Sequence, residues 1–127
     1  VIAGWPVIDP LYRYQHVALA KNNQNFISAH LAYWGTEEAM AEGSGATAVL
    51  QDEHPDLPPI LLVLKEGDQN HPLPMQEQFV EAYRRRGGSI RVEMFQGLPE
   101  HGMEVTPEVP ESLRAIEMFM EFIAAHA

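Results

Sequence analysis

The segment PPILLVLKEGDQNHP, residues 58–72, carries the strongest fold signal in this sequence. Ile60 to Leu64 form an uninterrupted apolar run, which is typical of a parallel strand that is covered on both faces. The run ends in Gly67 and Asp68, where the chain turns before a predicted helix. A carboxylate therefore stands just beyond a buried strand, and in open α/β sheets ligands bind beyond the carboxyl ends of the strands.

Strands and helices alternate along much of the chain. The apolar opening segment, 1–8, predicts a short buried strand that stops at Asp9. Residues 89–95 predict a strand at a sheet edge, because apolar and charged residues alternate there. The apolar side of that strand is expected to hold Ile90, Val92 and Met94. We therefore expect an α/β fold with a mostly parallel sheet flanked by helices.

Two amphipathic helices are predicted in the second half of the chain. The first spans 74–86, ends at a Gly-Gly pair, and should bury Met75, Phe79, Val80 and Tyr83. The second runs from Pro110, which suits a first helical turn, to His126. Its buried face is expected to consist of Leu113, Ile116, Phe119, Met120 and Ile123.

Residues 11–58 have a mixed pattern that is rich in Asn, Gln, His and Ala, and they predict two or three short helical pieces. The clearest piece is TEEAMAEGSG, residues 36–45. Thr36 can cap its start, acidic residues favour the positive end of the helix, and the glycines end it. The proline-rich segment QDEHPDLPP, 51–59, predicts a loop.

Composition narrows the function classes. A length of 127 residues fits one domain, and 46% hydrophobic residues suffice for a packed core. The net charge of −10 argues against binding to nucleic acid or to an anionic membrane surface. There is no cysteine, and no apolar run approaches the ~20 residues of a membrane-spanning helix. No phosphate loop or dinucleotide fingerprint occurs, so no cofactor and no metal is expected.

Asp68 and His101 are the candidate catalytic residues. Each follows a predicted strand, and parallel neighbouring strands bring such loops to the same end of a sheet. A carboxylate bonded to the Nδ1–H of a histidine fixes the tautomer and stabilises the imidazolium, which leaves the other nitrogen free to act as a general base. The sequence therefore predicts an Asp68–His101 pair.

With these residues in place, the chain resembles the C-terminal part of the α/β-hydrolase family, particularly its carboxylesterase and peptidase-like members. The resemblance rests on GWPVIDP (4–10), on PPILLVLKEGDQNHP (58–72) and on FVEAYRRRGGSIRVEMFQGLPEHGM (79–103). It implies a partial α/β-hydrolase domain over 1–127, with 11–58 as a cap-like or lid-like insert and 59–127 bearing the acid and the histidine. By the same resemblance, Asp68 is the acid and His101 the base of a Ser-His-Asp triad that acts on a small-molecule carboxylic ester, with an amide as the second choice.

The nucleophile elbow Gly-x-Ser-x-Gly is absent from these 127 residues, whose serines are Ser28, Ser44, Ser89 and Ser112. We therefore expect the nucleophilic serine upstream of this chain, in a missing N-terminal half of the same fold, and we expect the isolated chain to be inactive. The first strand would then be an uncovered apolar edge, which predicts pairing with another copy as a homo-oligomer.

Other interpretations stay open. The chain can be a non-catalytic α/β domain that binds a partner, or a structural complement to its missing half. Asp68 can simply cap its own turn. His71 can line the site or be a turn histidine in water, and His54 can be a metal ligand or an ordinary loop residue.

Three further residues complete the candidates. Tyr33 and Trp34 fit either an acyl pocket or a small core within the insert. Asp9 is expected to bond local backbone where the first strand ends.

Overall fold

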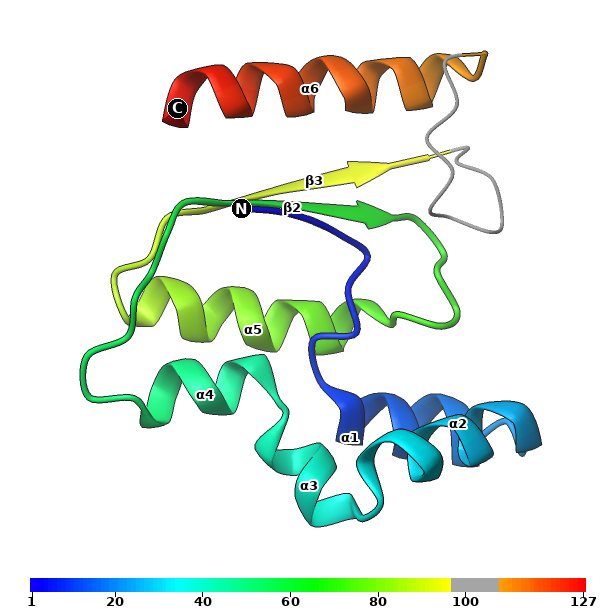
Figure 1. Cartoon of the computed structure of the whole chain (residues 1–127). Coiled ribbons are helices and arrows are strands. Elements are labelled where there is room, and N and C mark those ends of the chain that lie inside the picture. The colour runs from blue at the N-terminus through cyan, green and yellow to red at the C-terminus, as the bar shows by residue number, and fades with distance from the viewer. Residues whose placement is uncertain (97–107) are drawn as a thin grey trace. The chain divides into compact units, whose positions relative to one another are not determined.

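The structure, a computed structural model of the chain, describes residues 1–96 and 108–127 (Figure 1). Its backbone divides into two compact units. The first consists of Val1–Pro6, Pro58–Gly67 and Ser89–Ala127, and the second of Val7–Leu57 and Asp68–Gly88. Both units are assembled from segments that are far apart in the sequence.

The first unit contains a three-stranded parallel sheet with the order β1-β2-β3. The strands are β1 (Ile2–Gly4), β2 (Ile60–Lys65) and β3 (Ile90–Phe95). Ile60 to Leu64 are all buried, as their continuous apolar pattern predicts. The chain is thus an α/β protein whose described strands are all parallel, which confirms the predicted fold class at this level.

Helix α6 (Pro110–His126) lies along one face of this sheet (Figure 1). The buried cluster between them consists of Trp5, Leu61, Val63, Phe95, Ala115, Met118 and Phe122. Arg114 covers the edge of this cluster, since its Cζ atom lies 4.0 Å from the centre of the Phe95 ring. The bounds of α6 agree with the prediction, and burial of these apolar side chains is the main force that holds the helix to the strands.

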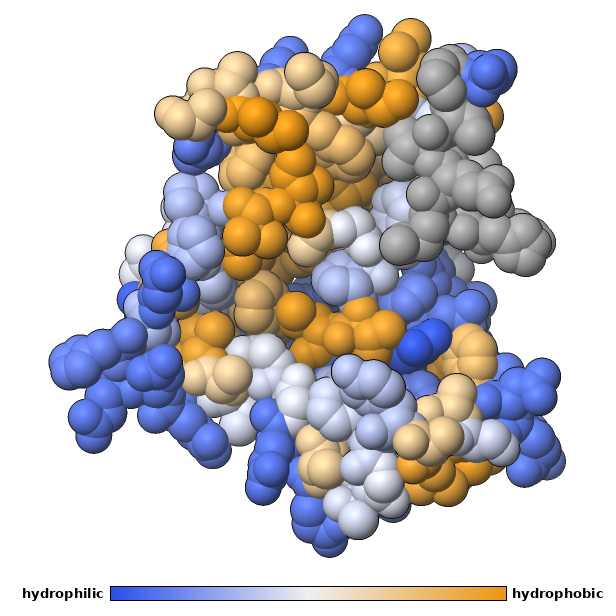
Figure 2. Space-filling model, viewed as in Figure 1, coloured by the Kyte–Doolittle hydropathy of each residue, from blue (hydrophilic) through white to orange (hydrophobic). Residues whose placement is uncertain are grey.

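The predicted buried face of α6 is wrong at Leu113, Met120 and Ile123, while half-buried Phe119 packs against the core cluster. Leu113 is 44% exposed, Met120 62% and Ile123 52%, while Ser112, Ala115, Met118 and Phe122 are buried. Ile116 and Phe119 are half-buried. The helix carries apolar residues nearly all round, so periodicity does not single out one face. Figure 2 shows the resulting apolar surface over α6 and beside the N-terminus.

The predicted buried side of β3 is wrong in the same way at one residue. Ile90 is buried and Val92 is half-buried, but Met94 is 41% exposed and Phe95 is fully buried. Phe95 belongs to the cluster under α6, on the side that the alternating pattern assigns to charged residues. The period of two is kept, and Phe95 is buried because helix α6 covers the face of the strand on which it lies.

Strand β1 is shorter than the predicted segment 1–8. Trp5 has a φ of +31°, which extended backbone does not allow, and the strand ends at Gly4. Trp5 still donates a backbone hydrogen bond to the carbonyl of Val63, at 2.8 Å. The tryptophan ring is thereby held in the core of the unit.

The second unit is helical. Its elements are α1 (Pro10–Arg13), the π-helix η1 (Tyr14–Leu19), α2 (Gln24–Trp34), α3 (Glu37–Glu42), α4 (Gly45–Gln51) and α5 (Leu73–Arg85). Residues 11–58 thus form more helical pieces than the two or three that were predicted. A small core of Tyr14, Ala18 and Met40 is packed by Leu11, Phe26, Ile27 and Trp34.

Local capping explains why a segment with so mixed a pattern becomes helical. Four helices begin with a side-chain oxygen that accepts a hydrogen bond from a backbone N–H. The donors and acceptors are Tyr12 to Asp9 in α1, Phe26 to Asn23 in α2, Ala39 to Thr36 in α3 and Thr47 to Ser44 in α4. Each cap satisfies a donor that the helix itself leaves unpaired. The capping role of Thr36 was predicted and is confirmed.

Helix α5 has the predicted buried face, with Met75, Phe79, Val80 and Tyr83 all buried. The helix ends at Arg85 and is closed by Gly87, whose φ of +88° favours glycine, and the N–H of Gly88 bonds the carbonyl of Tyr83 at 2.9 Å. Helix α4 packs against α5 at Gly45, where an added Cβ would lie 3.1 Å from the Phe79 ring.

Candidate functional site

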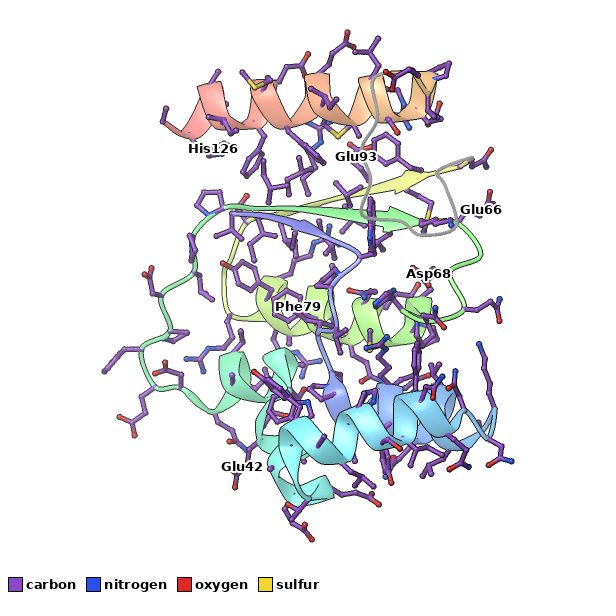
Figure 3. The ribbon with its side chains drawn as sticks, turned by 45° about the vertical axis from the view of Figure 1, so that its right-hand side comes forward. Glu42, Glu66, Asp68, Phe79, Glu93 and His126 are labelled. Atoms are coloured by element: carbon purple, nitrogen blue, oxygen red, sulfur yellow. The ribbon has the colours of Figure 1, made fainter. Side chains whose placement is uncertain are left out.

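Asp68 lies in the turn that follows β2 (Figure 3). Gly67 precedes it with a φ of +69°, a left-handed backbone conformation that residues other than glycine adopt only with strain. The turn ends at Pro72, after which α5 begins at Leu73. The chain therefore places the carboxylate between a buried parallel strand and the start of a helix, as the sequence predicted.

The Asp68 carboxylate is held by donors from its own turn. Its Oδ1 atom accepts hydrogen bonds from the backbone N–H of Asn70, at 2.8 Å, and of His71, at 3.0 Å. Its Oδ2 atom lies 3.0 Å from Nδ1 of His71. The two side chains are largely buried, with exposed fractions of 13% for Asp68 and 19% for His71. The carboxylate is thereby fixed in one orientation.

The electrostatics of the turn keep Asp68 ionised. Partial burial raises the pKa of the Asp68 carboxyl, but the hydrogen bonds from Asn70 and His71 outweigh that effect. The pKa consequently lies below its usual value. A lowered pKa favours the ionised carboxylate, which is the form that can orient an imidazole and stabilise its positive charge.

Two basic side chains fasten the backbone of the same turn. The Nε atom of Arg13 donates to the carbonyl of Asn70 at 3.0 Å, and Nζ of Lys21 donates to the carbonyl of Gln69 at 2.8 Å. Burial lowers the pKa of the Arg13 guanidinium, and the charge of Asp68 partly restores it. The positive charge of Arg13 therefore also favours the ionised form of Asp68.

His71 is the partner of Asp68 that the structure describes. Its Nδ1 faces Oδ2, so the neutral ring carries its proton on Nδ1 and leaves Nε2 as a hydrogen-bond acceptor. In the sequence this pair appears only as an Asp and a His three positions apart, which also fits an ordinary turn. A histidine oriented by a carboxylate has the arrangement that proton transfer requires.

His101, the predicted base, lies outside the described residues 1–96 and 108–127. The pairing of Asp68 with His101 therefore stays a prediction. The carboxylate nevertheless has room for a second partner, because a carboxylate offers about four acceptor sites and the bonds in this turn use three. The free site is on Oδ2.

The remaining sequence candidates have local roles. Asp9 caps α1 by accepting from the N–H of Tyr12 at 2.9 Å, so the expected bond to local backbone is confirmed. Its other oxygen lies 3.5 Å from Oγ of Ser44, which caps α4. His54 is exposed in the loop before β2, where its N–H bonds Oδ1 of Asp52 at 2.9 Å.

Tyr33 and Trp34 differ in their surroundings. Tyr33 is 80% exposed, whereas Trp34 is half-buried and packs on the small core of the helical unit. The rings meet edge to face, with centroids 5.1 Å apart. Both line a pocket in the helical unit, together with Arg13 and His30.

Metal and membrane features were also sought in residues 1–96 and 108–127. Within these ranges no group of three or more His, Asp or Glu side chains is arranged to hold a metal ion. None of the helices in them is long and apolar enough to cross a bilayer.

No protein-family model matches this chain, and no curated protein or solved structure matches it with significance. The resemblance to α/β hydrolases accordingly stays an expectation that rests on the sequence motifs. The function has to be argued from the described residues.

Proposed function

We propose that this chain supplies the acid and the base of a serine hydrolase that acts on carboxylic esters. The single observation that carries the proposal is the Asp68 carboxylate, which is half-buried, has a lowered pKa and is held by three hydrogen bonds in the turn that follows a buried parallel strand. Asp68 is the triad acid and His101 the triad base. The nucleophilic serine comes from outside these 127 residues, as they contain no Gly-x-Ser-x-Gly.

The reaction follows from these roles. His101 takes the proton of the serine hydroxyl as the serine oxygen attacks the ester carbonyl. The resulting imidazolium is stabilised by Asp68 and returns the proton to the leaving alcohol. Water then releases the acid from the acyl-enzyme by the same proton transfers. His101 has to contact Oδ2 of Asp68, because Oδ1 is occupied by two backbone donors.

The Asp68 turn is suited to this role because it does not need to rearrange. Gly67, Asn70 and His71 set the carboxylate before substrate binds, so that little reorganisation accompanies the development of charge on His101. His71 shares Oδ2 and is a positioning residue in this scheme.

One observation favours a second candidate function, a non-catalytic domain that binds a partner. All the hydrogen bonds given above for Asp68 stay within residues 68–71, so they also explain the residue as a structural cap. The exposed apolar residues of α6 would then belong to the partner interface.

The test uses the parent protein, meaning this chain together with the proposed upstream half that bears the serine. The measured reaction is the hydrolysis of p-nitrophenyl butyrate. His101→Ala should remove most of kcat and leave folding nearly unchanged, and Asp68→Asn should lower kcat by roughly 10³ to 10⁴-fold. His54→Ala is the matched control, because it removes an exposed loop histidine, and it should retain wild-type activity. Full activity in either of the first two variants would refute the triad.

The chain by itself provides a second arm of the test. The isolated chain, a species with a mass of 14.3 kDa, should show no ester hydrolysis above the buffer rate and no labelling by a fluorophosphonate. Turnover by that species would contradict the missing nucleophile. A parent protein that neither hydrolyses esters nor reacts with the fluorophosphonate would favour the binding domain.

A further inference from the structure

A pocket in the helical unit is lined by residues outside the Asp68 turn. One of these residues, Arg13, also donates a hydrogen bond to the backbone of that turn. Its volume is about 260 Å³, which is near the lower end of small-molecule sites. Helix α2 provides one wall, and the lining residues are Val7, Arg13, Ala29, His30, Tyr33 and Trp34. The wall is thus mainly apolar and aromatic, with one permanent positive charge.

Arg13 is held in place by a backbone carbonyl and an aromatic ring, neither of which neutralises its positive charge. Its Nε bonds the carbonyl of Asn70, and its Cζ lies 4.6 Å from the centre of the Phe26 ring. Within residues 1–96 and 108–127, no carboxylate forms an ion pair with the guanidinium. Among the described residues, the terminal N–H groups of Arg13 therefore have no carboxylate partner, and burial partly desolvates the guanidinium.

Two more features give the pocket a defined shape. His30 is buried, with an exposed fraction of 6%. Its Nδ1–H donates a hydrogen bond to the carbonyl of Phe26 at 2.7 Å, which fixes the orientation of the ring. The rings of Tyr33 and Trp34, which both line the pocket, contact each other edge to face. The π-helix η1 begins directly after Arg13, and π-helical turns occur frequently at functional sites.

We propose that this pocket binds a small organic anion, one carboxylate attached to a flat apolar group. The guanidinium of Arg13 would pair with the carboxylate through two parallel hydrogen bonds, and Trp34 and Tyr33 would contact the apolar part. The chain has a net charge of −10, so non-specific attraction does not explain anion binding here. The site goes beyond the esterase proposal and holds whether or not Asp68 acts in catalysis.

The test is an NMR titration of the chain with phenylacetate, and with phenylacetamide as the neutral analogue. The indole N–H signal of Trp34 should shift and saturate, while that of Trp5 serves as the internal reference because Trp5 does not line the pocket. Phenylacetate should bind about ten to a hundred times more tightly than the amide, since hydrogen bonds to charged groups are the stronger ones.

Variants locate the binding. Arg13→Met should abolish the preference for the anion, whereas Arg85→Met, which removes an exposed charge on α5, should leave it intact. Ala29→Leu adds bulk to the pocket lining while Arg13 is kept, and it should abolish binding of both compounds. The proposal is overturned if phenylacetate causes no saturable shift, if both compounds bind equally, or if binding survives Ala29→Leu.

Discussion

Nδ1 of His71 lies 3.0 Å from Oδ2 of Asp68, and the pair is formed within a turn of four residues. In the proposed triad, the same oxygen also accepts a hydrogen bond from His101. Oδ2 has one further acceptor site, so the two histidines can share it. In the proposed triad, His71 would steady the carboxylate and His101 would carry the proton.

Asp68→Asn should alter how stability depends on pH. The pKa of Asp68 is lowered in the folded chain, so its ionised form stabilises the fold above the unfolded pKa of about 3.9, and this contribution is lost as pH falls through the folded pKa. Urea unfolding should therefore show the largest gap between wild type and variant above about pH 5. A gap that persists unchanged to about pH 2 would contradict the lowered pKa.

Gly67→Ala should destabilise the chain by about 1–2 kcal/mol, because φ is +69° at this residue. Nothing lies within 4 Å of an added Cβ, so the cost comes from the backbone alone. Gly4→Ala is the matched control, since it is equally open and has no positive φ. Equal unfolding free energies for the two variants, measured in urea, would show that the turn is not strained by a side chain.

Two neighbouring residues test which face of α6 is buried. Phe122→Ala should cost about 3–5 kcal/mol, because the ring belongs to the core cluster of the first unit. Ile123→Ala should cost less than about 1 kcal/mol, since the side chain is 52% exposed. Thermal and urea unfolding of both variants give the comparison, and the reverse order would restore the face predicted from periodicity.

The parts of the fold that sequence reasoning predicted well have one-sided patterns. The run Ile60 to Leu64 has a single outcome, a strand that is buried throughout. Helix α5 is apolar on one face and polar on the other, so its buried residues follow from the period. Its closure by Gly87 follows from the positive φ that glycine permits.

The parts that it missed depend on tertiary contacts. Helix α6 is apolar on several faces, and contact with Leu61, Val63 and Phe95 decides which one is covered. The bond between Asp68 and His71 could have been suspected from their spacing, but nothing in the sequence separates it from an ordinary turn. The pocket requires Arg13 to meet residues of α2, which no local pattern encodes.

The most direct test of the account is a pH titration of the histidine ring protons by NMR, in the wild-type chain and in Asp68→Asn. A paired carboxylate raises the pKa of an imidazole. We expect Asp68→Asn to lower the pKa of His101, and to do so also when His71 is replaced by alanine. If Asp68→Asn leaves the pKa of His101 unchanged, Asp68 serves only its own turn and the triad assignment is contradicted.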